Sequence, residues 1–315
     1  MRLVYVKALL AHVGRSLKVR RAVLSLLVLL SIAIFYHLSS PDYMTSILIQ
    51  FIAKDVDSRV KIPFHEWKQC VEKNISEYRN DSNKLWWNLC KGVTLCEKHP
   101  FMARLEILDF RNSDEIKRHI PSLQEKPSII VTLGIGKDTA AEKAVRKVLP
   151  KGSLFYGADP MQEVNEDLFN KLGTYFPFAV KAKSQNSIAN VLFNGSYVTR
   201  RVMHIDLAYF LTEIIGHKIY DDLWIDAEGA EYELFPYFYR GGKLDQHGIT
   251  LCQFNMEVHW PNDARKKLFR DFILKILEDN RYAFFRPVQA RHMRLYFLNF
   301  SDRHCVSKYI FRKTT

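Results

Sequence analysis

The chain has 315 residues, of which 48% are hydrophobic and 25% are charged, and its net charge is +12. This composition is that of a globular protein with one large domain and an appendage, and it excludes an intrinsically disordered chain. Half of the net charge lies in residues 1–21, which contain no acidic side chain. The remainder has no arginine-rich stripe with interleaved aromatic residues, so no nucleic-acid partner is expected.

The first predicted element is a membrane anchor at residues 22–38. Residues 22–36 carry no charge, and with Leu38 the run approaches the roughly 17 residues that a short transmembrane helix needs. Because the basic tail at residues 1–21 precedes this run, the positive-inside rule places the tail in the cytosol and the rest of the chain in the lumen. We therefore expect a single-pass type II protein of the endoplasmic reticulum or Golgi. Ser39 and Ser40 keep a cleaved signal peptide open as the alternative.

Two further features favour the secretory lumen. Four glycosylation sequons begin at Asn74, Asn80, Asn194 and Asn299. Five cysteines are present, at positions 70, 90, 96, 252 and 305, so an oxidising lumen would allow one or two disulfides in the N-terminal part and would leave one thiol over. No CxxC pair or histidine cluster with zinc spacing occurs.

Residues 39–125 predict a stem and a helical N-terminal extension. Trp67, Trp86 and Trp87 lie in this stretch among charged residues, and we expect them to belong to a hydrophobic core. Residues 126–315 then form the predicted catalytic domain.

A βαβ unit begins this domain. An apolar strand at residues 129–133 ends in Gly134-Ile135-Gly136, a helix follows over residues 140–148, and a second strand over residues 154–158 ends at Asp159. Glycines at such a turn allow a cofactor to approach the backbone, and a carboxylate at the next strand end can bind ribose hydroxyls. The third glycine of the dinucleotide fingerprint and the P-loop motif are both missing, which favours S-adenosylmethionine over NAD or a nucleoside triphosphate.

Strands and helices alternate through the rest of the domain, which predicts an α/β fold with a mostly parallel sheet and an antiparallel edge. The further strands are predicted at residues 175–180, 202–205, 222–225, 250–258, 282–285 and 295–300. The further helices are predicted at residues 162–172, 207–215, 231–239 and 263–279.

A second acidic cluster follows the strand at residues 222–225. Asp226 and Glu228 come at its carboxyl end, Gly229 permits a sharp turn, and Glu231 opens a helix. Ligands of open α/β sheets bind outside the carboxyl ends of the strands, so this cluster and Gly134 should face one crevice. For Glu231, capping of the helix start is an equally good explanation.

Several of these strings resemble the FkbM-type methyltransferases. The resemblance rests on Leu-Gly-Ile-Gly-Lys-Asp-Thr (133–139), Tyr-Gly-Ala-Asp-Pro (156–160), Trp-Ile-Asp-Ala-Glu-Gly-Ala-Glu (224–231) and Phe-Asn-Met-Glu-Val-His (254–259). It implies a class I, Rossmann-like methyltransferase fold with seven strands, S-adenosylmethionine as donor and methylation of a hydroxyl oxygen. Carried over, Gly134 and Gly136 would line the methionine moiety, Asp159 would hold the ribose, and Asp226 and Glu228 would edge the cleft.

The chain departs from the family at one position, because no acid precedes Gly134. Asp138 or Glu142 is expected to supply the cofactor contact that the family's acid would make. Asp138 and Glu228 complete the predicted set of cofactor-binding residues.

In the predicted reaction His259 acts as the general base, with Glu257 and Asp226 as the other catalytic candidates. Simple strand alternation would send only one of His259 and Glu257 into the cleft, unless the strand has already ended before His259. No metal is required by this scheme. The acceptor is expected to be a small molecule or a glycan or lipid hydroxyl, and the oligomeric state is not predicted. Two alternatives remain: a metal-dependent glycosyltransferase that uses Asp226 and Glu228, and a non-catalytic methyltransferase-like binding domain.

Overall fold

The computed structural model describes residues 56–193, 196–259 and 261–311. Val56–Thr315 form one compact unit. Within the described residues no helix is both long enough and apolar enough to cross a membrane. The predicted anchor at residues 22–38 lies outside them.

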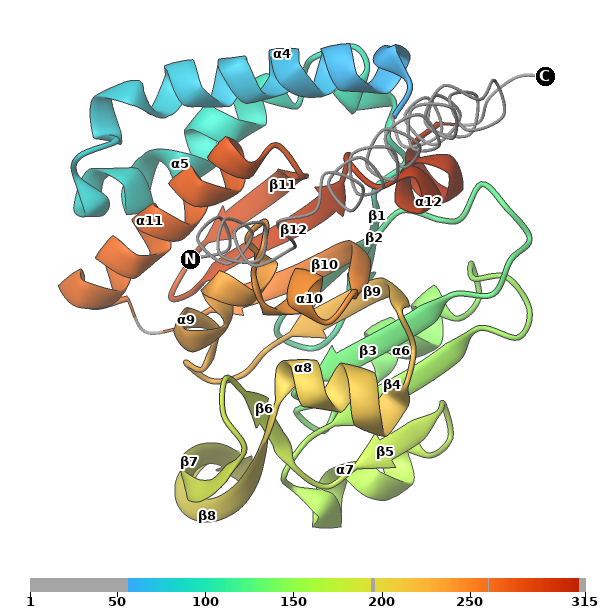
Figure 1. Ribbon diagram of the computed structural model, residues 1–315. Coiled ribbons are helices and arrows are strands. Elements are labelled where there is room, and N and C mark those ends of the chain that lie inside the picture. Colours follow the sequence, from blue (N-terminus) through green and yellow to red (C-terminus); the bar gives the residue numbers. More distant parts are fainter. Residues whose placement is uncertain (1–55, 194–195, 260, 312–315) are drawn as a thin grey trace, which may run out of the picture. The chain divides into compact units, whose positions relative to one another are not determined.

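A seven-stranded mixed sheet forms the centre of this unit, which confirms the predicted α/β class (Figure 1). Only β12 among these seven strands runs against the common direction, so the predicted antiparallel edge is the pair β11 and β12. In spatial order the strands are β11 (Tyr282–Gln289), β12 (Met293–Asn299), β10 (Thr250–Val258), β9 (Ile219–Ile225), β3 (Ile129–Leu133), β4 (Leu154–Ala158) and β5 (Thr174–Phe176).

The register of the parallel strands brings their carboxyl ends together. Leu133 of β3 pairs with Ala158 of β4 on one side and with Ile225 of β9 on the other. Ile225 in turn pairs with Met256 of β10. The segments that leave these four strands therefore emerge at one edge of the sheet.

Helices and short helical turns connect the strands. The α-helices after β3 are α6 (Ala140–Val145), α7 (Gln162–Phe169), α8 (Leu207–Tyr209), α9 (Glu231–Leu234), α10 (Lys243–Gln246), α11 (Asp263–Asp279) and α12 (Arg303–Cys305). Single-turn segments of tighter or wider helix cover Phe210–Ile215, Phe235–Phe238 and Val306–Ile310. Helix α11 has the predicted bounds because Asn262 caps its first turn and Asn280 ends it in a left-handed conformation, with φ of 50°.

The N-terminal extension packs on the sheet as two helices, α4 (Ser58–Ile75) and α5 (Ser82–Cys96), with short turns at Ser76–Tyr78 and Met102–Arg104 (Figure 1). Trp67 and Trp86 are buried, as predicted, but Trp87 is 62% exposed, so the core prediction was wrong for this residue. A disulfide joins Cys70 to Cys96, and Cys90 keeps a free thiol.

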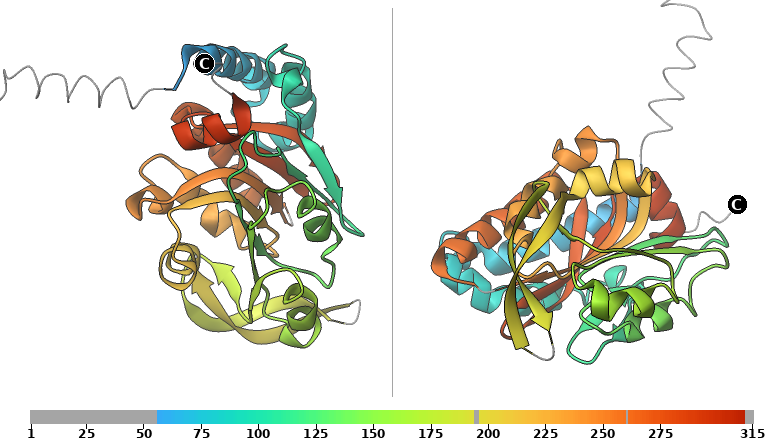
Figure 2. Two further views of the ribbon diagram at one scale, coloured as in Figure 1. Left: turned by 90° about the vertical axis from the view of Figure 1, so that its right-hand side faces the viewer. Right: turned by 90° about the horizontal axis from the view of Figure 1, so that it is seen from below.

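An unpredicted hairpin of β1 (Leu108–Arg111) and β2 (Ile116–His119) docks beside the sheet (Figure 2). Two amide side chains of β10 hold it through its backbone. Gln253 accepts a hydrogen bond from Ile120 N (2.8 Å), and Asn255 binds both Arg118 N (2.7 Å) and Arg118 O (2.8 Å).

A separate three-stranded sheet lies between β5 and β9 in the sequence. Its strands are β6 (Ala179–Lys181), β8 (Ser196–Asp206) and β7 (Gln185–Phe193) in spatial order. The strand predicted at residues 175–180 is therefore divided between two sheets, and the one predicted at residues 202–205 belongs to this second sheet.

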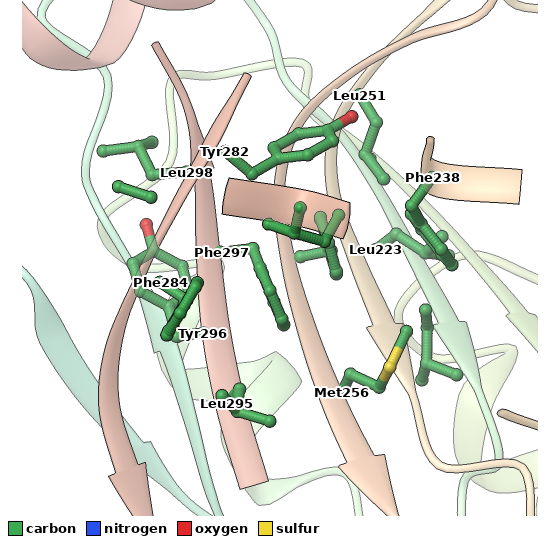
Figure 3. Close-up of a cluster of buried hydrophobic side chains, with 14 of the residues drawn as sticks. Leu223, Phe238, Leu251, Met256, Tyr282, Phe284, Leu295, Tyr296, Phe297 and Leu298 are labelled. Atoms are coloured by element: carbon green, nitrogen blue, oxygen red, sulfur yellow. The ribbon is translucent and has the colours of Figure 1, made fainter. Parts of the chain in front are cut away.

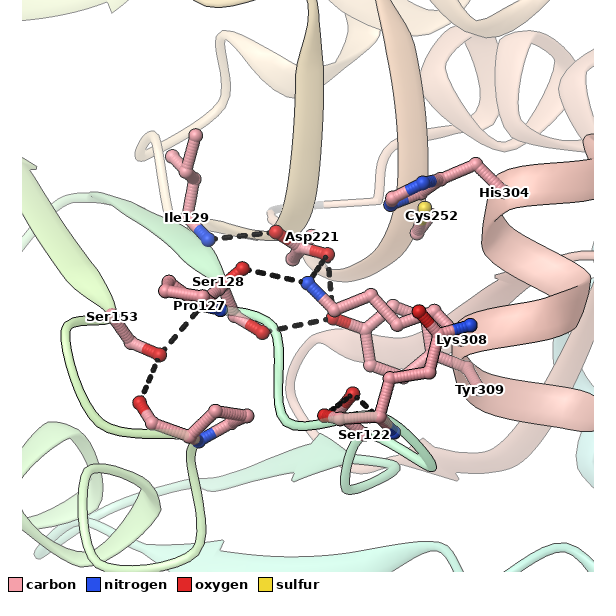
Figure 4. A network of polar contacts seen from close by, with 12 residues as sticks. Ser122, Pro127, Ser128, Ile129, Ser153, Asp221, Cys252, His304, Lys308 and Tyr309 are labelled. Carbon is pink, nitrogen blue, oxygen red and sulfur yellow. Dashed lines mark hydrogen bonds and ion pairs between the residues drawn. The ribbon is translucent and has the colours of Figure 1, made fainter.

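The main core packs aromatic and aliphatic side chains of β9 to β12 (Figure 3). Phe254 stacks on Phe297 with ring centroids 4.2 Å apart. At the edge of the sheet opposite the carboxyl ends, Asp221 accepts hydrogen bonds from Ile129 N, Lys308 Nζ and the Tyr309 hydroxyl (Figure 4). A second disulfide, Cys252–Cys305, fastens the same C-terminal segment to β10.

Candidate active site

A cavity of about 400 Å³ opens at the carboxyl ends of β3, β4, β9 and β10. The predicted site residues that line it are Gly134, Gly136, Asp138, Asp159, Asp226, Glu228, Glu257 and His259. The volume lies in the range of ligand pockets, and the position is the one that open α/β sheets use. The structure thus brings the eight predicted residues to one cavity.

The two glycines of the first loop have different surroundings. A Cβ at Gly134, where φ is +83°, would lie 2.0 Å from the carbonyl oxygen of Asp226. A Cβ at Gly136, where φ is +61°, would meet nothing within 4 Å. Gly134 is therefore required by contact between the β3 and β9 ends, whereas Gly136 leaves open space for a ligand.

Asp159 holds the glycine loop from the end of β4. Its carboxylate accepts hydrogen bonds from Ile135 N (2.8 Å), Met161 N (2.8 Å) and, at longer range, Gly136 N (3.4 Å). Burial raises the pKa of Asp159, and these backbone donors oppose the rise. The side chain lines the cavity, but all of these hydrogen bonds go to backbone N–H groups, so in this structure Asp159 mainly holds the glycine loop in place.

The two acids that could replace the missing contact behave differently. Asp138 lines the cavity and accepts hydrogen bonds from Ser113 N and Ala140 N, both at 2.8 Å, so it ties the hairpin to the start of α6. Glu142 instead turns away from the cavity toward Thr132, whose hydroxyl donates to it at 3.1 Å. The prediction that Glu142 could supply the contact is therefore wrong.

A tight turn after β9 presents the second acidic cluster. Glu228 has a φ of 50° and Gly229 a φ of 100°, so two successive residues adopt left-handed backbone. Glu231 folds back beneath this turn and accepts hydrogen bonds from Ala227 N and Gly229 N, both at 2.9 Å. Glu231 is fully buried, and its two hydrogen bonds give it the structural role of holding this turn in place.

His259 stands at the centre of the cluster. Its Nδ1 lies 2.9 Å from Glu231, and its Nε2 lies 3.3 Å from Asp226, 3.7 Å from Glu257 and 3.9 Å from Glu228. Burial lowers the pKa of His259, but the bond to Glu231 and the charges of Asp226 and Glu257 outweigh it and raise the pKa to about 9. With the cavity in this state the imidazole is cationic at neutral pH, which does not suit the predicted role of general base.

Glu257 and Asp226 differ in how strongly they are held. Arg294 binds both oxygens of Glu257 at 2.8 and 2.9 Å and lowers its pKa against the effect of burial. Burial raises the pKa of Asp226 well above its usual range, although the charges of Lys117 and His259 oppose the rise. Of this pair, Asp226 is thus the carboxylate whose protonated form is favoured by its surroundings.

Both His259 and Glu257 line the cavity, which is the exception that the prediction allowed for a strand that has already ended. The reason is that β10 ends at Val258, and the alternation of faces ends with it.

Several residues of the site were not predicted. Glu115 and His292 line the cavity, as does Arg294, while Lys117 lies behind it and binds Glu115 at 2.6 Å. Burial lowers the pKa of Lys117, but Glu115 and Asp226 raise it to about 12. These residues come from the hairpin and from the β11–β12 region, and no sequence motif links them to the glycine loop.

The opposite wall is more apolar. Val180, Ile188 and Val191 of the three-stranded sheet line it, together with Met161 at the start of α7. The cavity therefore has an acidic side at β9 and β10 and an apolar side at β6 to β8.

Comparison with known families identifies the domain. The model of the methyltransferase FkbM domain matches residues 89–302, more than half of the chain. The chain belongs to the FkbM methyltransferase family. The match begins within α5, so the FkbM domain includes part of the helical extension as well as the central sheet.

Three proteins that are similar to this FkbM methyltransferase differ widely from it in sequence. An uncharacterized protein of Caenorhabditis elegans is 22% identical over 259 residues, which cover 80% of this chain and 82% of that protein. A human methyltransferase 10 domain containing protein superposes with a TM-score of 0.32 at 13% identity, covering 70% of this chain and 97% of that one. A Clostridium thermocellum protein proposed to be an rRNA methylase superposes with a TM-score of 0.34 at 6% identity, covering 56% and 88%.

Proposed function

We propose that this FkbM methyltransferase uses S-adenosylmethionine to methylate a hydroxyl oxygen. The observation that carries the proposal is the open space over Gly136 at the end of β3, within a cavity whose far wall is acidic. A sulfonium donor is a cation, and an acidic wall favours it over an anionic nucleotide.

The residues around the cavity fit such a donor. Gly136 and the backbone of the loop would hold the methionine part, Asp159 would face the ribose, and the apolar wall at Met161 and Val191 would hold the adenine. When bound, the donor supplies a methyl group on an already activated sulfur, so the protein's main tasks are to orient the acceptor and exclude water.

The acceptor hydroxyl must lose its proton during transfer. Asp226 is the proposed proton acceptor, because it lines the cavity and its raised pKa makes it a stronger base than an ordinary carboxylate. His259 would then position Asp226 rather than accept the proton itself.

We further propose that the acceptor is a hydroxyl on a glycan or lipid and that the domain faces the secretory lumen behind a signal anchor at residues 22–38. The basic tail and the apolar run support this topology. Two disulfides in the described part of the chain are typical of a protein that folds in an oxidising compartment.

Calorimetric titration of the protein with S-adenosylhomocysteine, and separately with UDP in the presence and absence of Mn²⁺, tests the donor. We expect S-adenosylhomocysteine to bind without metal and UDP not to bind. Binding of UDP alone would favour the glycosyltransferase alternative instead.

A further inference from the structure

At the acidic side of the cavity, two groups of metal-ligating atoms share His259 and together comprise five side chains: Asp226, Glu228, Glu257, His259 and His292. We name them the His259 cluster. Ligating atoms of Asp226, Glu228 and His259 all lie within 4.8 Å of one another, and so do those of Glu257, His259 and His292. His259 belongs to both groups and is 3% exposed.

The orientation of His259 is fixed from behind. Glu231 is held by two backbone amides and lies 2.9 Å from Nδ1 of His259, so Nδ1 carries a proton and donates a hydrogen bond to the carboxylate. Nε2 is consequently the nitrogen that faces Asp226, Glu228 and Glu257. A carboxylate that binds the far nitrogen of a histidine is the usual support of a metal-ligating imidazole.

The spacing at Nε2 suits a metal better than direct hydrogen bonds. Charge-assisted hydrogen bonds are usually about 2.7–2.9 Å long, whereas Nε2 lies 3.3 Å from Asp226 and 3.9 Å from Glu228. Two ligands about 2.1 Å from one ion are about 3.0–3.4 Å apart at octahedral or tetrahedral angles. The Asp226 distance already fits, and a small rotation of the Glu228 side chain would bring the second within range.

Two buried polar atoms in the cluster accept or donate no hydrogen bond among the described residues. They are Oδ1 of Asp226 and Nδ1 of His292. A buried polar atom that forms no hydrogen bond costs free energy, and a bound cation would reduce that cost for a carboxylate oxygen or an imidazole nitrogen. The basic side chain nearest to Asp226 Oδ1 is His259 itself, at 3.3 Å, whereas Arg294 binds Glu257 and Lys117 binds Glu115.

We propose that Asp226, Glu228 and His259 bind one divalent first-row metal ion in this cavity. Mixed imidazole and carboxylate ligands favour ions such as Mn²⁺ or Zn²⁺ over Mg²⁺. Glu257 is not assigned as a ligand because Arg294 occupies both of its oxygens. If the proposed methyl transfer is correct, the ion would stand beside the acceptor oxygen and favour its deprotonated form. Asp226 would then hold the ion, and the ion would replace it as the group that promotes loss of the proton. Metal binding itself does not depend on that function.

The test is titration of the full chain, purified in detergent and stripped with a chelator, with Mn²⁺ and with Zn²⁺ at pH 7.5 in the absence of cofactor. We expect one ion of at least one of these metals per chain, and at least tenfold weaker binding by Asp226→Asn and by His259→Gln. Glu233→Gln removes an exposed acid on the same cavity wall that lies outside the cluster, so its affinity should stay within about twofold.

Melting temperatures in the presence of chelator show that each variant is folded before its affinity is compared. Failure of the wild-type chain to bind either metal at millimolar concentration would overturn the proposal, and so would equal binding by the wild type and both cluster variants. Parallel titration with S-adenosylhomocysteine separates the two proposals. If the chain binds S-adenosylhomocysteine but no metal, only the metal proposal is contradicted. If it binds metal but not S-adenosylhomocysteine, only the proposed methyl donor is contradicted.

Discussion

Gly134 and Gly136 belong to one motif, yet their neighbours assign them different roles. Gly134 lies against the backbone of Asp226, so it fits the end of β3 to the end of β9. Gly136 borders open space in the cavity. A motif alone does not distinguish a glycine that serves packing from one that serves a ligand.

Alanine substitutions should separate these roles. Gly134→Ala places a Cβ against a backbone oxygen that cannot move without shifting β9, so we expect a loss of roughly 3 kcal/mol or more in the free energy of unfolding. Gly136→Ala should cost only about 1–2 kcal/mol for its left-handed backbone, and should weaken S-adenosylhomocysteine binding. Chemical denaturation and calorimetry measure the two effects, and equal losses of stability would contradict this assignment.

The buried carboxyl of Glu142 should make the free energy of unfolding depend on pH. Burial raises its pKa from 4.5 to about 7, despite opposing contributions that include Lys117 and the Thr132 hydroxyl. The folded state therefore binds this proton more tightly than the unfolded state, and the group's contribution to stability is present below pH 4.5 and is lost as the pH rises to about 7.

Glu142→Gln replaces this carboxyl by a neutral group that can still accept the Thr132 hydrogen bond. We expect the variant to match the wild type near pH 4.5 and to exceed it by about 1–3 kcal/mol at pH 7.5. Denaturant unfolding of both proteins across this range provides the measurement. Parallel stability profiles would show that Glu142 ionises normally.

At the scale of elements, predictions succeeded where a segment's own pattern determines its structure. Strands β3, β4 and β10 and helix α11 have the predicted bounds because apolar runs, turn residues and caps are local signals. The hairpin β1–β2 was missed because amide side chains of β10, more than a hundred residues away, hold it. The β6–β8 sheet was misassigned for the same reason, since pairing between distant strands leaves no local pattern.

The same limit applies to the site. The carboxyl ends of β3, β4 and β9 could be predicted because parallel strands bring their ends to one edge. The partners that determine the charge of the site could not, because Arg294 reaches Glu257 from β12, and Glu115 and Lys117 come from the hairpin, which no motif links to the site. The charge of His259 could not be predicted either, because Glu231, Asp226 and Glu257 together raise its pKa to about 9.

The docking of the hairpin gives a prediction for Asn255. Its side chain satisfies the buried N–H and C=O of Arg118, so Asn255→Ala would leave both groups without partners. We expect a loss of about 2–4 kcal/mol in unfolding free energy. Gln162→Ala, at an exposed residue at the start of α7, is a suitable comparison and should change stability by no more than about 0.5 kcal/mol. Similar effects of the two substitutions would argue against a structural role for the hairpin contact.

At the scale of the whole molecule, the sequons differ in accessibility. Asn80 is exposed, whereas Asn299 is 3% exposed and its side chain binds Leu251 O, Ser301 N and Asp302 N. Asn74 is partly buried and donates to Gly92 O. A glycan therefore fits the folded domain at Asn80 and not at Asn299.

If the proposed luminal topology is correct, Asn80→Gln should reduce the mobility shift that glycosidase treatment produces in expressed protein. Asn299→Gln should leave the shift unchanged and lower the melting temperature instead, because it disturbs buried hydrogen bonds. A complete absence of any shift in the wild type would count against a luminal domain.

The bond between Cys252 and Cys305 bears on how the protein should be produced. It fastens the segment that carries Lys308 and Tyr309 to β10, and these two side chains in turn cover Asp221 at the start of the sheet. Loss of a native disulfide typically costs about 2–5 kcal/mol. Protein produced in a reducing bacterial cytoplasm would lack this disulfide, and its C-terminal segment would not be linked covalently to β10. An oxidising expression host should therefore give the higher yield of soluble protein.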